Sequence, residues 1–175
     1  MQDNHSPTNR QESSFGGRRD AQSGVSRLRY AVFVPTVLLA SDLASLRHEL
    51  RTMLEGPDLF VEEVANGPDV VTRVEEGGVD LAILDMQIGS MGAMAICMEL
   101  RHEESYGAAE PVPVLMLLDR RPDVFLARRS GAEGFVVKPL DPQRVRAAVR
   151  ALLQGGGYED ESLRPATIRV GSADV

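Results

Sequence analysis

Five short apolar runs alternate with five segments of helical periodicity, and this alternation is the strongest constraint on the fold. The apolar runs are TVLLAS at 36–41, LFVEEV at 59–64, LAILD at 81–85, VPVLMLL at 112–118 and GFVV at 134–137. The run at 81–85 is almost continuously apolar, as is typical of a strand covered on both faces. Alternating strands and helices predict an α/β fold of (βα)5 type, a doubly wound parallel five-stranded sheet with right-handed crossovers.

The segments between these runs carry helix signals. Apolar residues recur at helical spacing, and glycine or proline marks most of the ends. Asp141 and Pro142 have the residue types of an N-cap and a first helical position. The expected helices cover 43–54, 68–74, 93–104, 122–130 and 142–153.

The two ends of the chain differ in composition from the middle. Residues 1–34 are rich in Ser, Gly, Asn, Gln and Arg without periodicity, so we expect a disordered extension, and a translation start nearer the first strand is an alternative. Three glycines at 155–157 predict a flexible joint into a flexible tail, 155–175. The expected domain is therefore 35–154, and a tail of this composition predicts no output domain.

Charge and cysteine content exclude several classes of function. The net charge is −7, and residues 35–154 hold 12 basic against 19 acidic residues, which argues against a nucleic-acid surface. Cys97 is the only cysteine, lies in a helical pattern and is interpreted as a core residue. No secretory signal opens the chain, and the apolar run at 30–40 is too short for a bilayer, which needs about 20 apolar residues. We expect a cytoplasmic protein without a membrane span.

Polar residues follow several of the expected strands. In an open parallel sheet, ligands bind beyond the carboxyl ends of the strands. Two close carboxylates, Asp42 and Asp85, repel each other unless a cation lies between them, and Mg²⁺ prefers such oxygen ligands. The residues at the ends of the first, third, fourth and fifth strands are Ser41 and Asp42, Asp85, Leu118 and Asp119, and Lys138.

Lys138 is the only lysine beside 18 arginines. A lysine ammonium is a compact point charge, whereas the guanidinium of arginine is a broad fork. The sequence therefore suggests a narrow slot beside Asp85, where Lys138 neutralises a phosphoryl oxygen and Pro139 fixes the backbone through a cis bond. A simple turn or helix cap at the aspartates, and a solvated charge at Lys138, are the alternatives.

The segment from Thr36 to Leu153 resembles the receiver domain of bacterial response regulators. The motifs that carry the resemblance are VLLASD, DLAILDMQIGSMG and GAEGFVVKPLD. It implies a flavodoxin-like fold with strand order 2-1-3-4-5 and Asp85 as the phosphoacceptor. It also implies that Mg²⁺ is bound by Asp42, Asp85 and the backbone carbonyl of Gln87, that Lys138 contacts the phosphoryl group, and that Phe135 is the switch aromatic.

The sequence departs from the receiver pattern at four places. Ser41 replaces the first acid of the usual pair, so we expect weak Mg²⁺ binding. Leu118 replaces the switch hydroxyl and cannot donate a hydrogen bond worth about 1.5–3 kcal/mol to a charged group. Asp119 replaces a small residue and can repel phosphate or partner Lys138. Gly89 stands where proline is common.

The resemblance implies signalling by protein contact rather than enzymatic activity. A histidine kinase or phosphotransfer protein would supply phosphate, and the face of the fourth helix, fifth strand and fifth helix would bind an unknown protein target. A homodimer is also open. The arginines at 120, 121, 128 and 129 either serve that face or form a solvated patch. The alternatives are a pseudo-receiver scaffold that never takes phosphate and, less compatible with ASDLAS after the first strand, a flavin binder.

Overall fold

The computed structural model describes residues 33–107 and 110–160. Six parallel strands form one sheet in the order β2-β1-β3-β4-β5-β6. The strands are β1 (Thr36–Ala40), β2 (Phe60–Val64), β3 (Leu81–Asp85), β4 (Val114–Leu118), β5 (Gly134–Val137) and β6 (Tyr158–Glu159). The helices are α1 (Ala44–Leu54), α2 (Gly67–Glu75), α3 (Ala93–Ser105), α4 (Val124–Ser130) and α5 (Pro142–Leu153).

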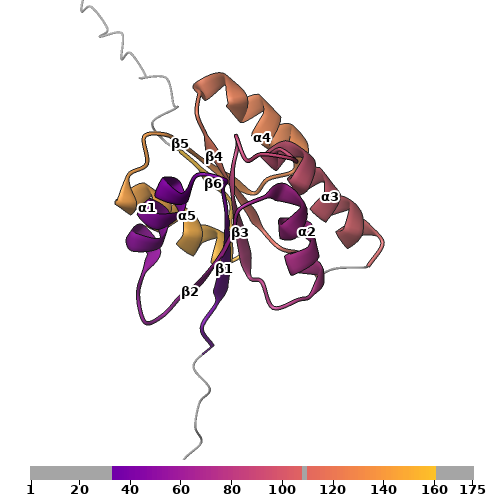
Figure 1. The fold of residues 1–175 in the computed structure, drawn as a ribbon, viewed down its shortest axis with the longest axis horizontal. Helices are drawn as coiled ribbons and strands as arrows, with labels where there is room; N and C mark the ends of the chain where they lie inside the picture. Colours follow the sequence, from indigo (N-terminus) through magenta and orange to yellow (C-terminus); the bar gives the residue numbers. More distant parts are fainter. Residues whose placement is uncertain (1–32, 108–109, 161–175) are drawn as a thin grey trace, which may run out of the picture. The chain divides into compact units, whose positions relative to one another are not determined.

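The helices cover both faces of the sheet (Figure 1). One apolar cluster joins α1 and α5 to one face, and a second joins α2, α3 and α4 to the other. Alternate residues of the same strand enter different clusters, as the two-residue period of a strand requires. Every residue of β3 and β4 is buried, because these strands lie inside the sheet under helices on both faces.

The expected flavodoxin-like order 2-1-3-4-5 is confirmed, and the five predicted strands and helices are all present. Asp141 caps α5, because its Oδ1 accepts hydrogen bonds from the amides of Gln143 and Arg144, both at 3.0 Å. The start of α4 differs from the prediction. Pro122 lies in a separate 3₁₀ turn, Arg121–Asp123, and α4 begins at Val124, because Asp123 pairs with Arg120 instead of capping a helix.

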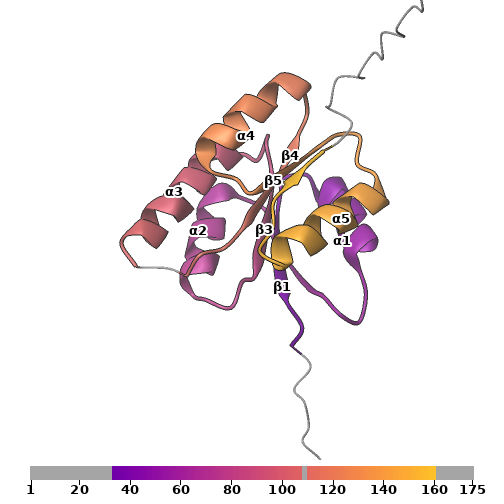
Figure 2. The same cartoon turned by 180° about the vertical axis from the view of Figure 1, so that it is seen from behind.

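Residues 155–160 differ from the prediction of a flexible tail. Gly155 takes a left-handed conformation with φ 77° after α5, and the chain then runs into β6 beside β5 (Figure 2). The five-stranded sheet therefore gains a short sixth strand. The predictions for residues 1–32 and 161–175 fall outside the described residues.

Within the described part of the chain, no helix has the length and apolar character needed to cross a membrane.

Candidate functional site

Asp85 lies at the carboxyl end of β3, between β1 and β4, and its side chain is fully buried. Its Oδ1 accepts a hydrogen bond from Lys138 Nζ at 2.7 Å. Its Oδ2 accepts a second one from Ser41 Oγ, also at 2.7 Å. A buried carboxylate is costly unless it is paired and hydrogen-bonded, and these two donors meet that requirement.

Lys138 follows β5 and reaches across the end of β4 to Asp85. Its backbone N–H donates to the carbonyl of Leu118 at 2.8 Å, and its bond to Pro139 is cis, as suggested from the sequence. Its ammonium also donates to Asp119 Oδ1 at 3.0 Å. Partial burial by itself lowers the pKa of Lys138, but hydrogen bonds to Asp85 and Asp119 outweigh it and raise the pKa above its ordinary value. Lys138 is therefore firmly cationic.

Ser41 lies directly after β1 and is buried. Besides donating to Asp85, its Oγ accepts from the amide of Leu43 at 3.2 Å, and its carbonyl accepts from Arg47 Nη1 at 2.6 Å. Sequence reasoning treated this position only as a lost acid and missed the bond to Asp85. A serine at one strand end facing an aspartate at the next strand end was the available signal.

Asp119 partners Lys138, which was one of the two roles open to it from the sequence. Its other carboxylate oxygen, Oδ2, is buried and has no hydrogen-bond partner among the described atoms. An unpaired buried acceptor is unfavourable by about 1–3 kcal/mol. The site therefore holds one ammonium between two carboxylates, with one carboxylate oxygen unsatisfied.

The other two expected metal ligands, Asp42 and Gln87, also lie at this edge of the sheet. Asp42 is exposed, and its Oδ2 lies 3.2 Å from the position that a Cβ on Gly89 would occupy, so glycine leaves room for this carboxylate. The backbone N–H of Gln87 donates to Asp85 Oδ1 at 3.4 Å, and the metal-binding role of the Gln87 carbonyl stays a prediction.

The donor chemistry fits a weak Mg²⁺ site. Among the described residues, no three or more acidic, histidine or cysteine side chains converge as a metal cluster. Mg²⁺ keeps several waters and needs only one or two carboxylates. Both oxygens of Asp85 already accept hydrogen bonds, however, so a cation would have to compete with Ser41 or Lys138.

Leu118 and Phe135 belong to the same apolar cluster. Leu118 is fully buried at the end of β4 and offers no donor to the site. Phe135 is 3% exposed, and the guanidinium carbon of Arg128 lies 5.7 Å from the centre of its ring. The expected switch aromatic is thus packed in the interior, and its switch role stays a prediction.

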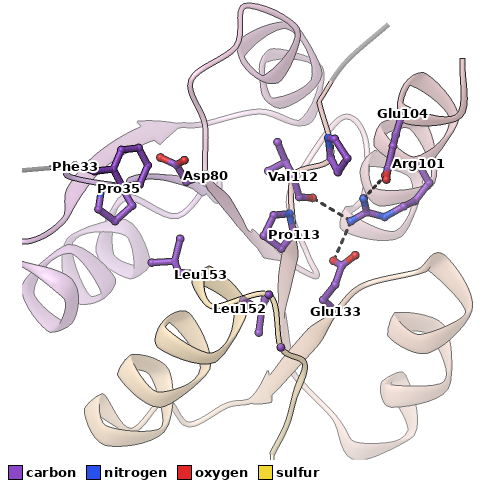
Figure 3. Close-up of a pocket in the computed structure, with 13 residues that line it drawn as sticks. Phe33, Pro35, Asp80, Arg101, Glu104, Val112, Pro113, Glu133, Leu152 and Leu153 are labelled. Atoms are coloured by element: carbon purple, nitrogen blue, oxygen red, sulfur yellow. Dashed lines mark hydrogen bonds and ion pairs between the residues drawn. The ribbon is translucent and has the colours of Figure 1, made fainter. Parts of the chain in front are cut away.

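A pocket of about 490 Å³ lies away from this site, at the other end of β4 (Figure 3). Its most polar wall is Arg101, which donates to Glu104, to Glu133 and to the carbonyl of Val112. Glu133 also accepts from the amide of Val114 at 2.7 Å. These charged groups bind one another, so we do not include the pocket in the functional site.

A parallel sheet with helices on both faces, and an aspartate–lysine pair at the carboxyl ends of its strands, define a signalling receiver. The family model described as response regulator receiver domain matches residues 37–150, and the chain belongs to this family. Such domains act in two-component signalling as modules rather than enzymes, and they generally interact with histidine kinases or phosphotransfer proteins.

Relatives of known sequence agree with this assignment. An uncharacterized response regulatory protein of Mycobacterium tuberculosis is 41% identical over 102 residues, which cover 58% of this chain and 74% of that protein. The DNA-binding response regulator MtrA of Mycobacterium leprae is 32% identical over 67% of this chain but only 51% of its own length. The absence of an output domain therefore stays a prediction.

Solved structures share the fold at low identity. A LuxR-family two-component response regulator from Aurantimonas has a TM-score of 0.66 at 20% identity, covering 75% of this chain and 93% of its own. The chemotaxis protein CheY4 of Vibrio cholerae has a TM-score of 0.59 at 21% identity, covering 67% and 98%.

Proposed function

We propose that the domain receives a phosphoryl group on Asp85 and signals by protein contact. The observation that carries this proposal is the 2.7 Å contact between Lys138 Nζ and the fully buried carboxylate of Asp85. A lysine held at this distance can bind an oxygen of a phosphoryl group placed on the same carboxylate. The donor is a histidine kinase, a phosphotransfer protein or a small phosphodonor, and we place the exchange in the cytoplasm.

In the proposed step, a carboxylate oxygen of Asp85 forms a bond to phosphorus while the bond from phosphorus to the donor breaks. With acetyl phosphate, acetate leaves and an acyl phosphate remains on Asp85. Mg²⁺, when bound by Asp42, Asp85 and the Gln87 carbonyl, would neutralise charge on the phosphoryl oxygens. Lys138 would stabilise one of these oxygens, and Ser41 would hold the carboxylate in place.

A pseudo-receiver that binds partners without phosphate is the second candidate. It is favoured by the contact between Lys138 and Asp119 at 3.0 Å, because a carboxylate already uses the ammonium that a phosphoryl group would need. It is also favoured by Leu118, which cannot donate a hydrogen bond to that group. In this reading the site is a closed structural network.

Intact mass after incubation with Mg²⁺ and acetyl phosphate separates the two candidates. The proposal expects the wild type to gain about 80 Da, the added mass of one phosphoryl group. Asp85→Asn should lose the gain. Asp58→Asn, a matched change at an exposed aspartate in the loop before β2, should keep it.

A phosphate gain that persists in Asp85→Asn would contradict the proposed acceptor. Beryllofluoride, which mimics a phosphoryl group on a carboxylate, gives a second measurement by ¹⁹F NMR. If the wild type neither gains mass nor binds beryllofluoride with Mg²⁺ present, the pseudo-receiver is the correct reading.

We further propose that the target binds the docking face, which we define as α4, β5 and α5. On α4, Phe125 is exposed and lies between the exposed arginines at 121 and 129 along the chain. Aromatic residues and arginine are enriched at protein interfaces, so this helix supports contact with another protein.

A further inference from the structure

The outer edge of β5 is occupied by the chain's own residues 158–160. An exposed edge strand offers unpaired N–H and C=O groups to any extended chain. Here β6 pairs in parallel with β5, with Gly134 opposite Tyr158 and Phe135 opposite Glu159. After Glu159, the next residue of the segment also contacts β5, because the backbone N–H of Val137 donates to Asp160 Oδ2 at 3.1 Å. A side-chain carboxylate thus continues the pairing where the short strand ends.

Asp160 is bound by charge as well as by the sheet edge. Its side chain is fully buried, and its Oδ2 also accepts from Arg144 Nη1 at 2.5 Å. The other arm of Arg144, Nη2, donates to the carbonyl of Pro139 at 2.9 Å. A buried carboxylate needs such partners to remain charged, so this position is specific for an acid.

Glu159 makes the second acidic contact. Its two oxygens accept from Arg128 Nε at 3.0 Å and Nη2 at 2.8 Å. Both side chains are 59% exposed, so this ion pair adds little free energy to the docking of residues 158–160. Its two parallel hydrogen bonds orient the segment and favour a carboxylate at this position. Two adjacent carboxylates therefore meet one arginine from α4 and one from α5.

Glycines let this segment approach closely. A Cβ on Gly134 would lie 3.1 Å from the carbonyl oxygen of Tyr158, and one on Gly157 would lie 3.1 Å from the carbonyl oxygen of Glu133. The amide of Tyr158 donates to that same Glu133 carbonyl at 3.0 Å. The glycines at 155–157 thus allow β6 to approach β5 closely, in addition to connecting β6 to α5.

We propose that the β5 edge, Arg128 and Arg144 form a strand-addition site for an extended segment with two consecutive carboxylates, and that residues 158–160 fill it in cis. Strand addition takes affinity from main-chain bonds and specificity from side-chain pockets. A partner with such an acidic segment must displace residues 158–160 before it binds this part of the docking face. This inference does not depend on phosphorylation of Asp85, and its tests do not use phosphate.

A peptide competition in the full chain tests the site. The probe is a synthetic peptide of residues 154–160, QGGGYED, and the control is the same peptide with Glu159→Gln and Asp160→Asn. The ¹⁵N-labelled proteins are the wild type and two strand variants, Asp160→Ala and Gly157→Ala. Asp160→Ala removes the buried acid, and Gly157→Ala disturbs the approach by a different route. Glu75→Ala, at an exposed glutamate of α2, is the matched control protein.

The acidic peptide should shift the amide signals around Val137 and the Arg144 side chain in both strand variants. Saturation is expected well below millimolar peptide, because a segment that fills the site in cis must bind with a dissociation constant below the millimolar effective concentration that a short flexible tether supplies. The wild type and Glu75→Ala should show no such shifts, because the site is full. The neutral peptide should have no effect on any of the four proteins.

Hydrogen exchange provides a readout without peptide. The Val137 amide should exchange at least about tenfold faster in Asp160→Ala than in the wild type, while the amides of β4 keep their rates. Equal exchange in the two proteins would overturn the proposal. Equal binding of both peptides, or no binding of the acidic peptide by either strand variant, would also overturn it. Unchanged β4 amides show that the variants remain folded.

Discussion

Asp119 has two opposite effects on the site. It helps to hold Lys138, whose ammonium it contacts, but its negative charge would repel a phosphoryl group that approached the same ammonium in the proposed function. We predict that Asp119→Asn accelerates phosphorylation of Asp85 by acetyl phosphate by roughly tenfold, because the change removes about 1.4 kcal/mol of repulsion and keeps an oxygen acceptor for Lys138. Time-resolved intact mass measures the rate.

Glu49→Gln, at an exposed position of α1, is the control for a lost negative charge far from the strand ends. If both variants are accelerated equally, net charge is the cause and Asp119 has no local effect.

Ser41 gives a second prediction at the residue scale. Ser41→Asp restores the acid that receivers usually carry, but it places a carboxylate in a buried position against Asp85. We predict that the free energy of unfolding of the variant in EDTA is about 2 kcal/mol lower than that of the wild type, so that it unfolds at lower temperature. Millimolar Mg²⁺ should restore most of this loss. Thermal unfolding followed by circular dichroism with and without Mg²⁺ is the measurement. A loss that Mg²⁺ leaves unchanged would count against a metal site here.

The sequence predicted which residues gather at the site but not how they pair. Asp85 and Lys138 were predictable because they stand at the carboxyl ends of β3 and β5, which flank β4 in the same parallel sheet. Adjacent strand ends indicated that Ser41 and Asp85 lie close together, but the bond between them depends on the rotamer of a side chain that could equally cap a turn. For Asp119, repulsion and pairing were both open until the position of the ammonium was known.

At the scale of elements, β2 and α2 are joined by an ion pair. Glu62 accepts two hydrogen bonds from Arg73, at 2.6 and 3.0 Å. The side-chain hydrogen bond from Arg73 is the main cause that lowers the pKa of Glu62 below 4.5, and burial opposes it only in part. A lowered pKa stabilises the fold above the unfolded pKa, and this contribution is lost as the pH falls through the folded value.

We therefore predict that Glu62→Gln lowers the free energy of unfolding by about 0.5–1 kcal/mol at pH 7. The difference from the wild type should begin to shrink as the pH falls below the unfolded pKa of about 4.5, and it should vanish only below the lower folded pKa, where Glu62 is protonated in both states. Urea titrations at pH 7, 5 and 3.5 give the three values. A difference that is constant over this range would mean that Gln disturbs packing instead of removing a charge interaction.

Long elements were predictable, and the shortest one was not. Continuous apolar runs predict the strands β3 and β4, and the cap and the spacing of apolar residues predict α5. β6 has only two residues, and three glycines precede it, so no period can be read from it. Its position depends on contacts with Arg128 and Arg144, which lie far from it in the chain.

At the scale of the whole domain, Cys97 reports on global opening. It is fully buried in the cluster under α3, its Sγ lies 3.3 Å from the carbonyl of Ser130, and burial raises the pKa of its thiol. We predict that a thiol reagent labels the native protein at least about a thousandfold more slowly than the protein unfolded in guanidinium, because the thiol must first be exposed. Cys97→Ser gives the background signal. Rapid labelling under native conditions would show local opening of α3.

The two clusters explain why a doubly wound parallel sheet followed from the sequence. Strands covered on both faces must bring helices to both sides, and right-handed crossovers then leave few ways to connect five βα units. The choice of order 2-1-3-4-5 came from resemblance, since alternation alone does not distinguish it from other doubly wound orders.

The position of the only lysine between Asp85 and Asp119 also makes the domain convenient for spectroscopy. Reductive methylation with ¹³C-formaldehyde attaches NMR-visible methyl groups to amines, and a chain with one lysine yields a single lysine signal. That signal would come from the centre of the site without assignment of any other residue. The signal of the methylated lysine would therefore report the binding of a metal ion, a phosphoryl group or a partner.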